Sequence, residues 1–123
     1  MFEEITVTLN SMSDPRFIRQ TGEIIYFAND RHESADRQFN FNYCQLGDNR
    51  WRAYITRMPS LRGRSALGTI THRYWDEKNK PYVCWNSDIY TLRDMQTVSK
   101  FWADCMMEYI ATGKRFGPDA EHH

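Results

Sequence analysis

The sequence lacks any long apolar stretch, because its longest apolar runs are only a few residues. We therefore expect no helix that crosses a bilayer. The chain starts Met-Phe-Glu-Glu, without a basic n-region or an apolar h-region, so we expect no secretory signal. Together with mixed charges and a mean hydropathy of −0.74, these absences predict a soluble, cytoplasmic protein with no membrane partner.

Cysteine is scarce and shows no close pairing. The chain has three cysteines, Cys44, Cys84 and Cys105, and none belongs to a C-x-x-C motif. An odd number of separated cysteines favours free thiols in a reducing compartment over a disulfide framework. A structural zinc site needs closely spaced ligand pairs, which are absent. His122-His123 is either native or the visible part of a purification tag, so we give these histidines no metal role and predict no metal site.

Two further motifs of catalysis are missing. Gly63 and Gly68 stand apart and are not followed by Lys-Ser or Lys-Thr, so there is no phosphate-binding glycine loop. No carboxylates are paired at a spacing that suggests acid–base work on sugars. We therefore expect no cofactor, and the sequence favours a protein that is not an enzyme.

Length and aromatic content predict one α+β domain over residues 1–123. The seven Phe, seven Tyr and four Trp favour half-buried strands. Several segments alternate apolar and polar residues with the period of a strand. We expect a bent antiparallel sheet of five or six strands, a β-meander, within about residues 3–85. Its segments are Glu3–Asn10, Gly22–Ala28, Gln38–Gln45, Arg50–Met58, Thr69–Trp75 and Tyr82–Trp85, with Arg16–Gln20 as the start of a further strand.

The pattern changes after Thr91, where apolar residues recur at helical spacing. Thr91 followed by Asp94 is a variant of the capping box, and Gly113 is a typical C-cap. These signals predict a helix over about residues 92–112, which must pack across the sheet because one face is too apolar to stand alone. The predicted stripe is Leu92, Met95, Val98, Trp102, Cys105, Met106 and Tyr109.

Charge is distributed unevenly along this formally neutral chain. No acid occurs between Arg50 and Trp75, whereas residues 1–49 carry a net charge of −4 and residues 76–123 one of −2. A local imbalance of this kind can create a positive surface that selects partners. The six arginines of this acid-free window are Arg50, Arg52, Arg57, Arg62, Arg64 and Arg73.

This window suggests a binding module that recognises an anionic partner: a nucleic acid, a nucleotide or an acidic protein. Guanidinium groups match phosphate and carboxylate in a bidentate manner. The alternative is plain surface charge, neutralised by the acidic flanks. Strand alternation also places Trp51 inward and Arg50 and Arg52 outward, which separates aromatic from basic side chains. The candidate anion-binding residues are Arg52, Tyr54, Arg57, Arg62, Arg64 and Arg73.

Cys84 and His72 form a second candidate site, because a histidine can activate a nearby thiol. The competing interpretation is that Cys84 is packed in a core strand and inert.

The second half of the chain carries several features in a fixed order: residues 50–55 (Arg-Trp-Arg-Ala-Tyr-Ile), Pro59, residues 72–74 (His-Arg-Tyr), Cys84 and a helix ending Tyr-Ile-Ala-Thr-Gly113. In this order, residues 50–117 resemble bacterial ubiquitin-conjugating-enzyme-like (E2-like) proteins. The resemblance implies that Cys84 carries a thioester and that His72 is the family histidine. Thr71-His72-Arg73 stands where that family has His-Pro-Asn.

A third hypothesis is that the chain is a subunit of a homo- or hetero-oligomer without activity of its own. Dimerisation could use the edge of the sheet or a flank of the helix. Phe101, Met107 and Ile110 fall toward the side of the predicted apolar stripe, and they would form a partner patch if they were exposed together.

Overall fold

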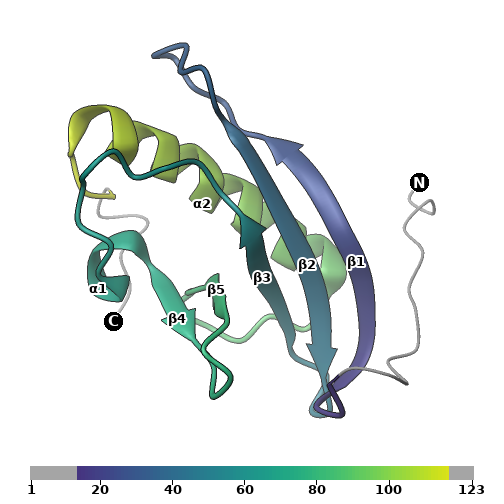
Figure 1. Ribbon diagram of the computed structural model, residues 1–123. Helices are drawn as coiled ribbons and strands as arrows, with labels where there is room; N and C mark the ends of the chain where they lie inside the picture. The colour runs from purple at the N-terminus through teal and green to yellow at the C-terminus, as the bar shows by residue number, and fades with distance from the viewer. Residues whose placement is uncertain (1–13, 117–123) are drawn as a thin grey trace.

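The computed structural model describes residues 14–116, which form a five-stranded antiparallel sheet and one long helix (Figure 1). The strands lie in the order β1-β2-β3-β5-β4, so the sheet is open and ends in a short pair of strands. This arrangement confirms the α+β fold predicted from the sequence. The elements are β1 (Phe17–Phe27), β2 (Gln38–Leu46), β3 (Trp51–Arg57), α1 (Gly68–Thr71), β4 (Arg73–Trp75), β5 (Pro81–Val83) and α2 (Leu92–Thr112).

The hairpin of β2 and β3 carries the centre of the core. In its register Phe41 lies opposite Ile55 and Tyr43 opposite Ala53, and all four side chains are buried. Alternation places these residues on the face that packs against α2. The turn between the strands includes Asn49 at φ 77°, a conformation that Asn tolerates well. The hairpin predicted from the sequence is therefore confirmed.

β1 is one strand, although the sequence divided this region at Thr21. Its pairing with β2 shifts between Phe17 and Arg19 and again between Gln20 and Glu23. At the second irregularity Gly22 has φ 80°, and its N–H donates a 3.0 Å hydrogen bond to the side-chain oxygen of Asn42. A bulge of this kind lets a strand continue past an irregular residue. The predicted strand over Glu3–Asn10 lies outside the described residues.

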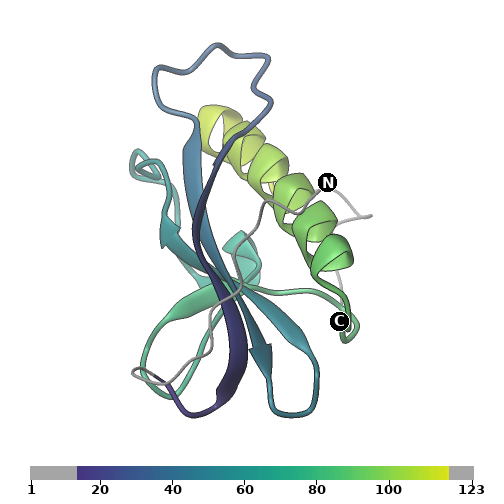
Figure 2. The same cartoon turned by 90° about the vertical axis from the view of Figure 1, so that its right-hand side faces the viewer.

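Helix α2 begins and ends at the predicted residues. The side chain of Thr91 accepts a 3.1 Å hydrogen bond from the N–H of Asp94, and Gly113 closes the helix at φ 77°. Figure 2 shows the helix on one side of the sheet. Trp102 packs edge-on against Phe39 with 5.6 Å between ring centroids. Within residues 14–116, no helix is long and apolar enough to cross a membrane.

The prediction of a strand over Thr69–Trp75 is wrong in its first half. Gly68–Thr71 is the short helix α1, and the chain returns to extended form only at Arg73. Thr71 is fully buried, and its hydroxyl donates a 2.9 Å hydrogen bond to the carbonyl oxygen of Leu67. His72 then ends the helix in the left-handed conformation, at φ 55°. Tertiary burial has thus overridden the strand preference of the threonines.

The predicted helix flank also needs correction. Met107 is 0 % and Ile110 1 % exposed, because both belong to the core between α2 and the sheet. The apolar stripe of α2 is wider than three- and four-residue spacing alone suggests. Phe101 is exposed as expected, but it stands without Met107 and Ile110 on the surface. The three residues do not form a shared patch.

Candidate functional site

The short strands β4 and β5 bring His72 and Cys84 together from positions twelve residues apart in the sequence. The strands pair antiparallel, with Arg73 opposite Val83. Beyond this pair, the N–H of Cys84 donates a 2.9 Å hydrogen bond to the backbone oxygen of His72. The two candidate residues therefore lie side by side at the end of the β4–β5 pair, where the sequence placed them in one hypothetical site.

A surface cleft of about 580 Å³ opens at this position, and we call it the Cys84 pocket. Its rim is unusually apolar for exposed surface, since Leu67 is 64 %, Tyr74 51 % and Trp75 41 % exposed. Exposed apolar side chains grouped around a cleft are typical of a binding surface. The pocket is lined by Leu67, Gly68, Thr69, His72, Arg73, Tyr74, Trp75 and Cys84.

Cys84, which lines this pocket, is only 9 % exposed. Burial raises its pKa, and a hydrogen bond with the hydroxyl of Tyr74 partly offsets that effect. The thiol is thus mainly protonated at neutral pH, with a hydroxyl beside it that stabilises the thiolate when it forms. The sequence did not point to Tyr74 as a site residue, because the pairing depends on the β4–β5 register.

The ring of His72 is engaged with Phe116. The two rings stack with centroids 4.6 Å apart and an interplanar angle of 21°. The left-handed backbone of His72 turns the chain from α1 into β4. These features fit a residue that shapes the pocket wall, while the hydroxyl of Tyr74 is the group that lowers the pKa of the thiol.

Most arginines of the acid-free window are bound to their own chain, far from one another. Arg57 forms a 2.7 Å ion pair with Asp36, and Arg50 pairs with Asp48 at 2.8 Å.

Arg64 instead binds the end of α2, where it donates hydrogen bonds of 3.2 Å to the carbonyl oxygens of Ile110 and Ala111. Cations at a helix C-terminus complement its dipole. These contacts give the three arginines structural roles.

The remaining candidates have different surroundings. Arg52 donates a 2.8 Å hydrogen bond to the hydroxyl of Tyr54 and stacks over the ring of Tyr82 at 4.2 Å. Arg62 is exposed on the loop before α1. Arg73 lines the Cys84 pocket. Of the six predicted anion-binding residues, Arg52 and Tyr54 are therefore in direct contact, whereas Arg57 and Arg64 are bound to other parts of the chain.

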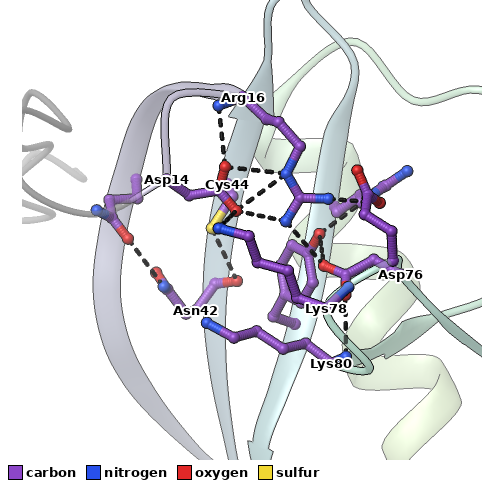
Figure 3. Close-up of polar contacts among 11 residues, drawn as sticks. Asp14, Arg16, Asn42, Cys44, Asp76, Lys78 and Lys80 are labelled. Carbon is purple, nitrogen blue, oxygen red and sulfur yellow. Dashed lines mark hydrogen bonds and ion pairs between the residues drawn. The ribbon is translucent and has the colours of Figure 1, made fainter.

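A polar cluster on the face of the sheet away from α2 joins distant parts of the chain (Figure 3). Asp76 accepts hydrogen bonds of 3.1 Å from Arg16 and 2.9 Å from the hydroxyl of Tyr54. Arg16 also forms an ion pair with Asp14. Burial alone would raise the pKa of Asp76, but bonds from the Lys80 backbone, Tyr54 and Arg16 outweigh it and lower that pKa to about 2. The cluster fixes the β4–β5 turn against β3.

Cys44 lies on the same face but has no features of a reactive thiol. It is fully buried beside a cavity of about 330 Å³. Burial raises its pKa to about 12. Such a thiol is packed and inert at neutral pH, so the Cys84 pocket is the stronger candidate site.

Metal binding finds no support in the described part of the chain. Residues 14–116 contain no group of three or more His, Cys, Asp or Glu side chains that could hold a metal ion. His122 and His123 lie outside that range. What the Cys84 pocket offers chemically is a thiol, a neighbouring hydroxyl and an apolar rim.

Comparison with known proteins found no match for the chain: no protein-family model, no curated protein and no solved structure matches it.

Proposed function

We propose that the chain is a cysteine-dependent acyl-transfer protein of the E2-like kind, in which Cys84 accepts an acyl group as a thioester. The observation that carries this proposal is the placement of Cys84 and Tyr74 in a cleft with an exposed apolar rim. The cleft supplies space for an acyl donor, and the rim supplies a surface for its carrier. The earlier resemblance of residues 50–117 to E2-like proteins is consistent with this role.

The reaction is a thioester exchange. The sulfur of Cys84 attacks the carbonyl carbon of a donor thioester, and a new carbon–sulfur bond forms as the donor's carbon–sulfur bond breaks. The proton of Cys84 ends on the departing donor thiol, so no oxidant or metal takes part. A thiol of raised pKa is rarely ionised at neutral pH, but its thiolate is the stronger nucleophile. Tyr74 would stabilise that thiolate by donating its hydroxyl hydrogen.

In this proposal His72 is a positioning residue. Its left-handed backbone and its stacking on Phe116 hold the start of β4, and with it Tyr74, beside Cys84. A His72→Ala variant should therefore change how many molecules carry a well-formed pocket. It should move the midpoint of the pH–rate profile of Cys84 upward, in the same direction as Tyr74→Phe, because the Tyr74 hydroxyl is then held less well beside the thiol.

The test is acylation of the native protein by the acetyl thioester of N-acetylcysteamine. Intact-mass spectrometry should detect one added acetyl group that neutral hydroxylamine removes, and peptide mapping should place it on Cys84. Cys84→Ala should abolish this signal. Cys105→Ala is the matched control, because Cys105 is a partly buried thiol whose pKa burial raises to about 11. Acetylation that is absent, or equally fast on Cys105, would refute the proposal.

A second candidate function is the binding module without chemistry. It is favoured by Arg52 and Arg73, which form no ion pair with a carboxylate of residues 14–116. Such a module would bind its anionic partner with strong salt dependence. Under either function we propose a reducing, cytoplasmic location, supported by Cys44, Cys84 and Cys105, which are not joined to one another by a disulfide.

A further inference from the structure

Arg73 sits in an environment of neutral groups. Its Nε donates a 2.9 Å hydrogen bond to the hydroxyl of Thr71, and Nη2 donates one of 3.1 Å to the carbonyl oxygen of Ala66. The sulfur of Met58 lies 3.7 Å from Nη1. The guanidinium also stacks over the ring of Trp75, 4.8 Å from its centroid. These contacts hold the side chain in place but carry no negative charge.

This environment differs from that of two other arginines of the same window. Arg50 and Arg57 each pair with an aspartate, whereas Arg73 has no acidic partner within residues 14–116. Arg73 is partly buried, and this burial lowers the pKa of its guanidinium. A partly buried charge without a counter-ion costs free energy. An anion that enters the site would recover part of that cost.

The position of the Arg73 side chain indicates where an anion would bind. Arg73 and Cys84 line the same cleft. A guanidinium has five N–H donors in a planar fork, and the contacts with Thr71, Ala66 and Met58 use three of them. The two remaining donors can hold the oxygens of a carboxylate or a phosphate.

We infer that Arg73 is the anion subsite of the Cys84 pocket and that the pocket takes a ligand with an oxyanion group, a carboxylate or a phosphate. This inference builds on the proposed function, since it names the charge of the acyl donor. The binding step itself does not require Cys84 to react.

The first experiment measures binding alone on the full chain. The Nε–H resonance of Arg73 is followed by NMR while succinate, or inorganic phosphate in a parallel series, is added at constant ionic strength. A saturable shift at Arg73, with none at the exposed Arg62, is expected, and the tighter of the two anions identifies the oxyanion class. Linear drift of both resonances with both anions would overturn the inference.

The second experiment compares acetyl and succinyl thioesters of N-acetylcysteamine, which share a leaving group and differ in one terminal carboxylate. Cys84 should react with the succinyl donor faster, by a factor on the order of ten. Arg73→Gln should abolish the preference, and Arg62→Gln should keep it. Arg73→Lys retains the charge without the fork and should give an intermediate preference, with the same circular dichroism spectrum as the native protein.

The two proposals fail in different ways. If neither thioester acylates Cys84 while Arg73 still binds succinate, the acyl-transfer function is refuted and the anion subsite stands. If both thioesters react at equal rates and the Arg73 resonance does not saturate, the subsite is refuted and the acyl-transfer function stands.

Discussion

The indole nitrogen of Trp102 donates a 2.9 Å hydrogen bond to the backbone oxygen of Thr71. Both residues are buried, at 2 % and 0 % exposure. The hydroxyl of Thr71 in turn accepts the bond from Nε of Arg73. A side chain in the middle of α2 therefore holds the junction of α1 and β4, and through it a residue of the Cys84 pocket.

Trp102→Phe should weaken this junction. The substitution leaves the Thr71 carbonyl without its indole donor and opens a small cavity, so we expect the free energy of unfolding to fall by about 2–4 kcal/mol. Urea denaturation followed by circular dichroism measures the change. Trp85→Phe, at a partly buried position, should cost less than half as much. Equal losses in the two variants would contradict a special role for the Trp102 bond.

Gly68→Ala should distort the pocket. A Cβ atom at Gly68 would lie 2.6 Å from the backbone oxygen of Arg73 and 3.0 Å from the ring of Trp75. Backbone cannot move aside cheaply, so we expect a loss of about 1–3 kcal/mol in unfolding free energy and a changed alkylation rate at Cys84. The matched control is Gly47→Ala, where the added atom meets nothing within 4 Å. If Gly68→Ala leaves the unfolding free energy unchanged, the close approach of Gly68 to Arg73 is absent in solution.

The stability of the fold should fall in acid because of Asp76. Its folded pKa is lowered from 3.8 to about 2, so the ionised form is favoured in the folded state. The resulting stability is fully present above pH 4 and is lost as the pH falls through the folded pKa of about 2. We expect about 2 kcal/mol from this group.

Asp76→Asn provides the check for this pH dependence. The free energy of unfolding of the native protein, measured by urea titration at several pH values, should drop between pH 4 and pH 2. The Asp76→Asn variant should show a smaller drop over the same interval. If the plots of unfolding free energy against pH run parallel for the native protein and Asp76→Asn, other carboxylates cause the acid sensitivity.

Tyr74→Phe should make Cys84 less reactive. Burial raises the pKa of the thiol, and the hydroxyl of Tyr74 opposes that rise. Removing the hydroxyl should raise the pKa further, so alkylation by iodoacetamide at pH 8 should slow by about fivefold. Tyr90→Phe, at another exposed tyrosine, should leave the rate unchanged. A rate that rises in Tyr74→Phe would show that the ring shields the thiol more than its hydroxyl helps it.

The sequence predicted the fold well where a local signal decides it. The β2–β3 hairpin follows from alternation and turn residues, and α2 follows from Thr91, Gly113 and the apolar stripe between them. The strand predicted over Thr69–Trp75 is wrong in its first half, because the burial of Thr71 under Trp102 determines that Gly68–Thr71 forms α1. Contacts between residues 31 positions apart leave no trace in a short window of sequence.

The candidate site divides in the same way. His72 and Cys84 lie in one pocket because a short turn joins their strands, which sequence spacing can suggest. The arginine window was a poorer guide, because composition shows charges but not partners. Arg57 reaches Asp36, just before the neighbouring strand β2, and Arg64 reaches the C-terminal end of α2. The register of the strands and the path of the loops determine these ion pairs, and counting charges along the sequence gives no information on either.

Apart from the Asp76 cluster, the β4–β5 pair meets the rest of the sheet in one register pair, Tyr54 with Tyr82, whereas β1 and β2 pair along most of their length. A short edge unit of this kind opens by itself at a lower free energy than global unfolding. Its amide protons should exchange with solvent before those of β2. Because Cys84 directly follows β5, the same opening would expose its sulfur transiently, and the frequency of opening would set how fast a bulky thiol reagent reaches it.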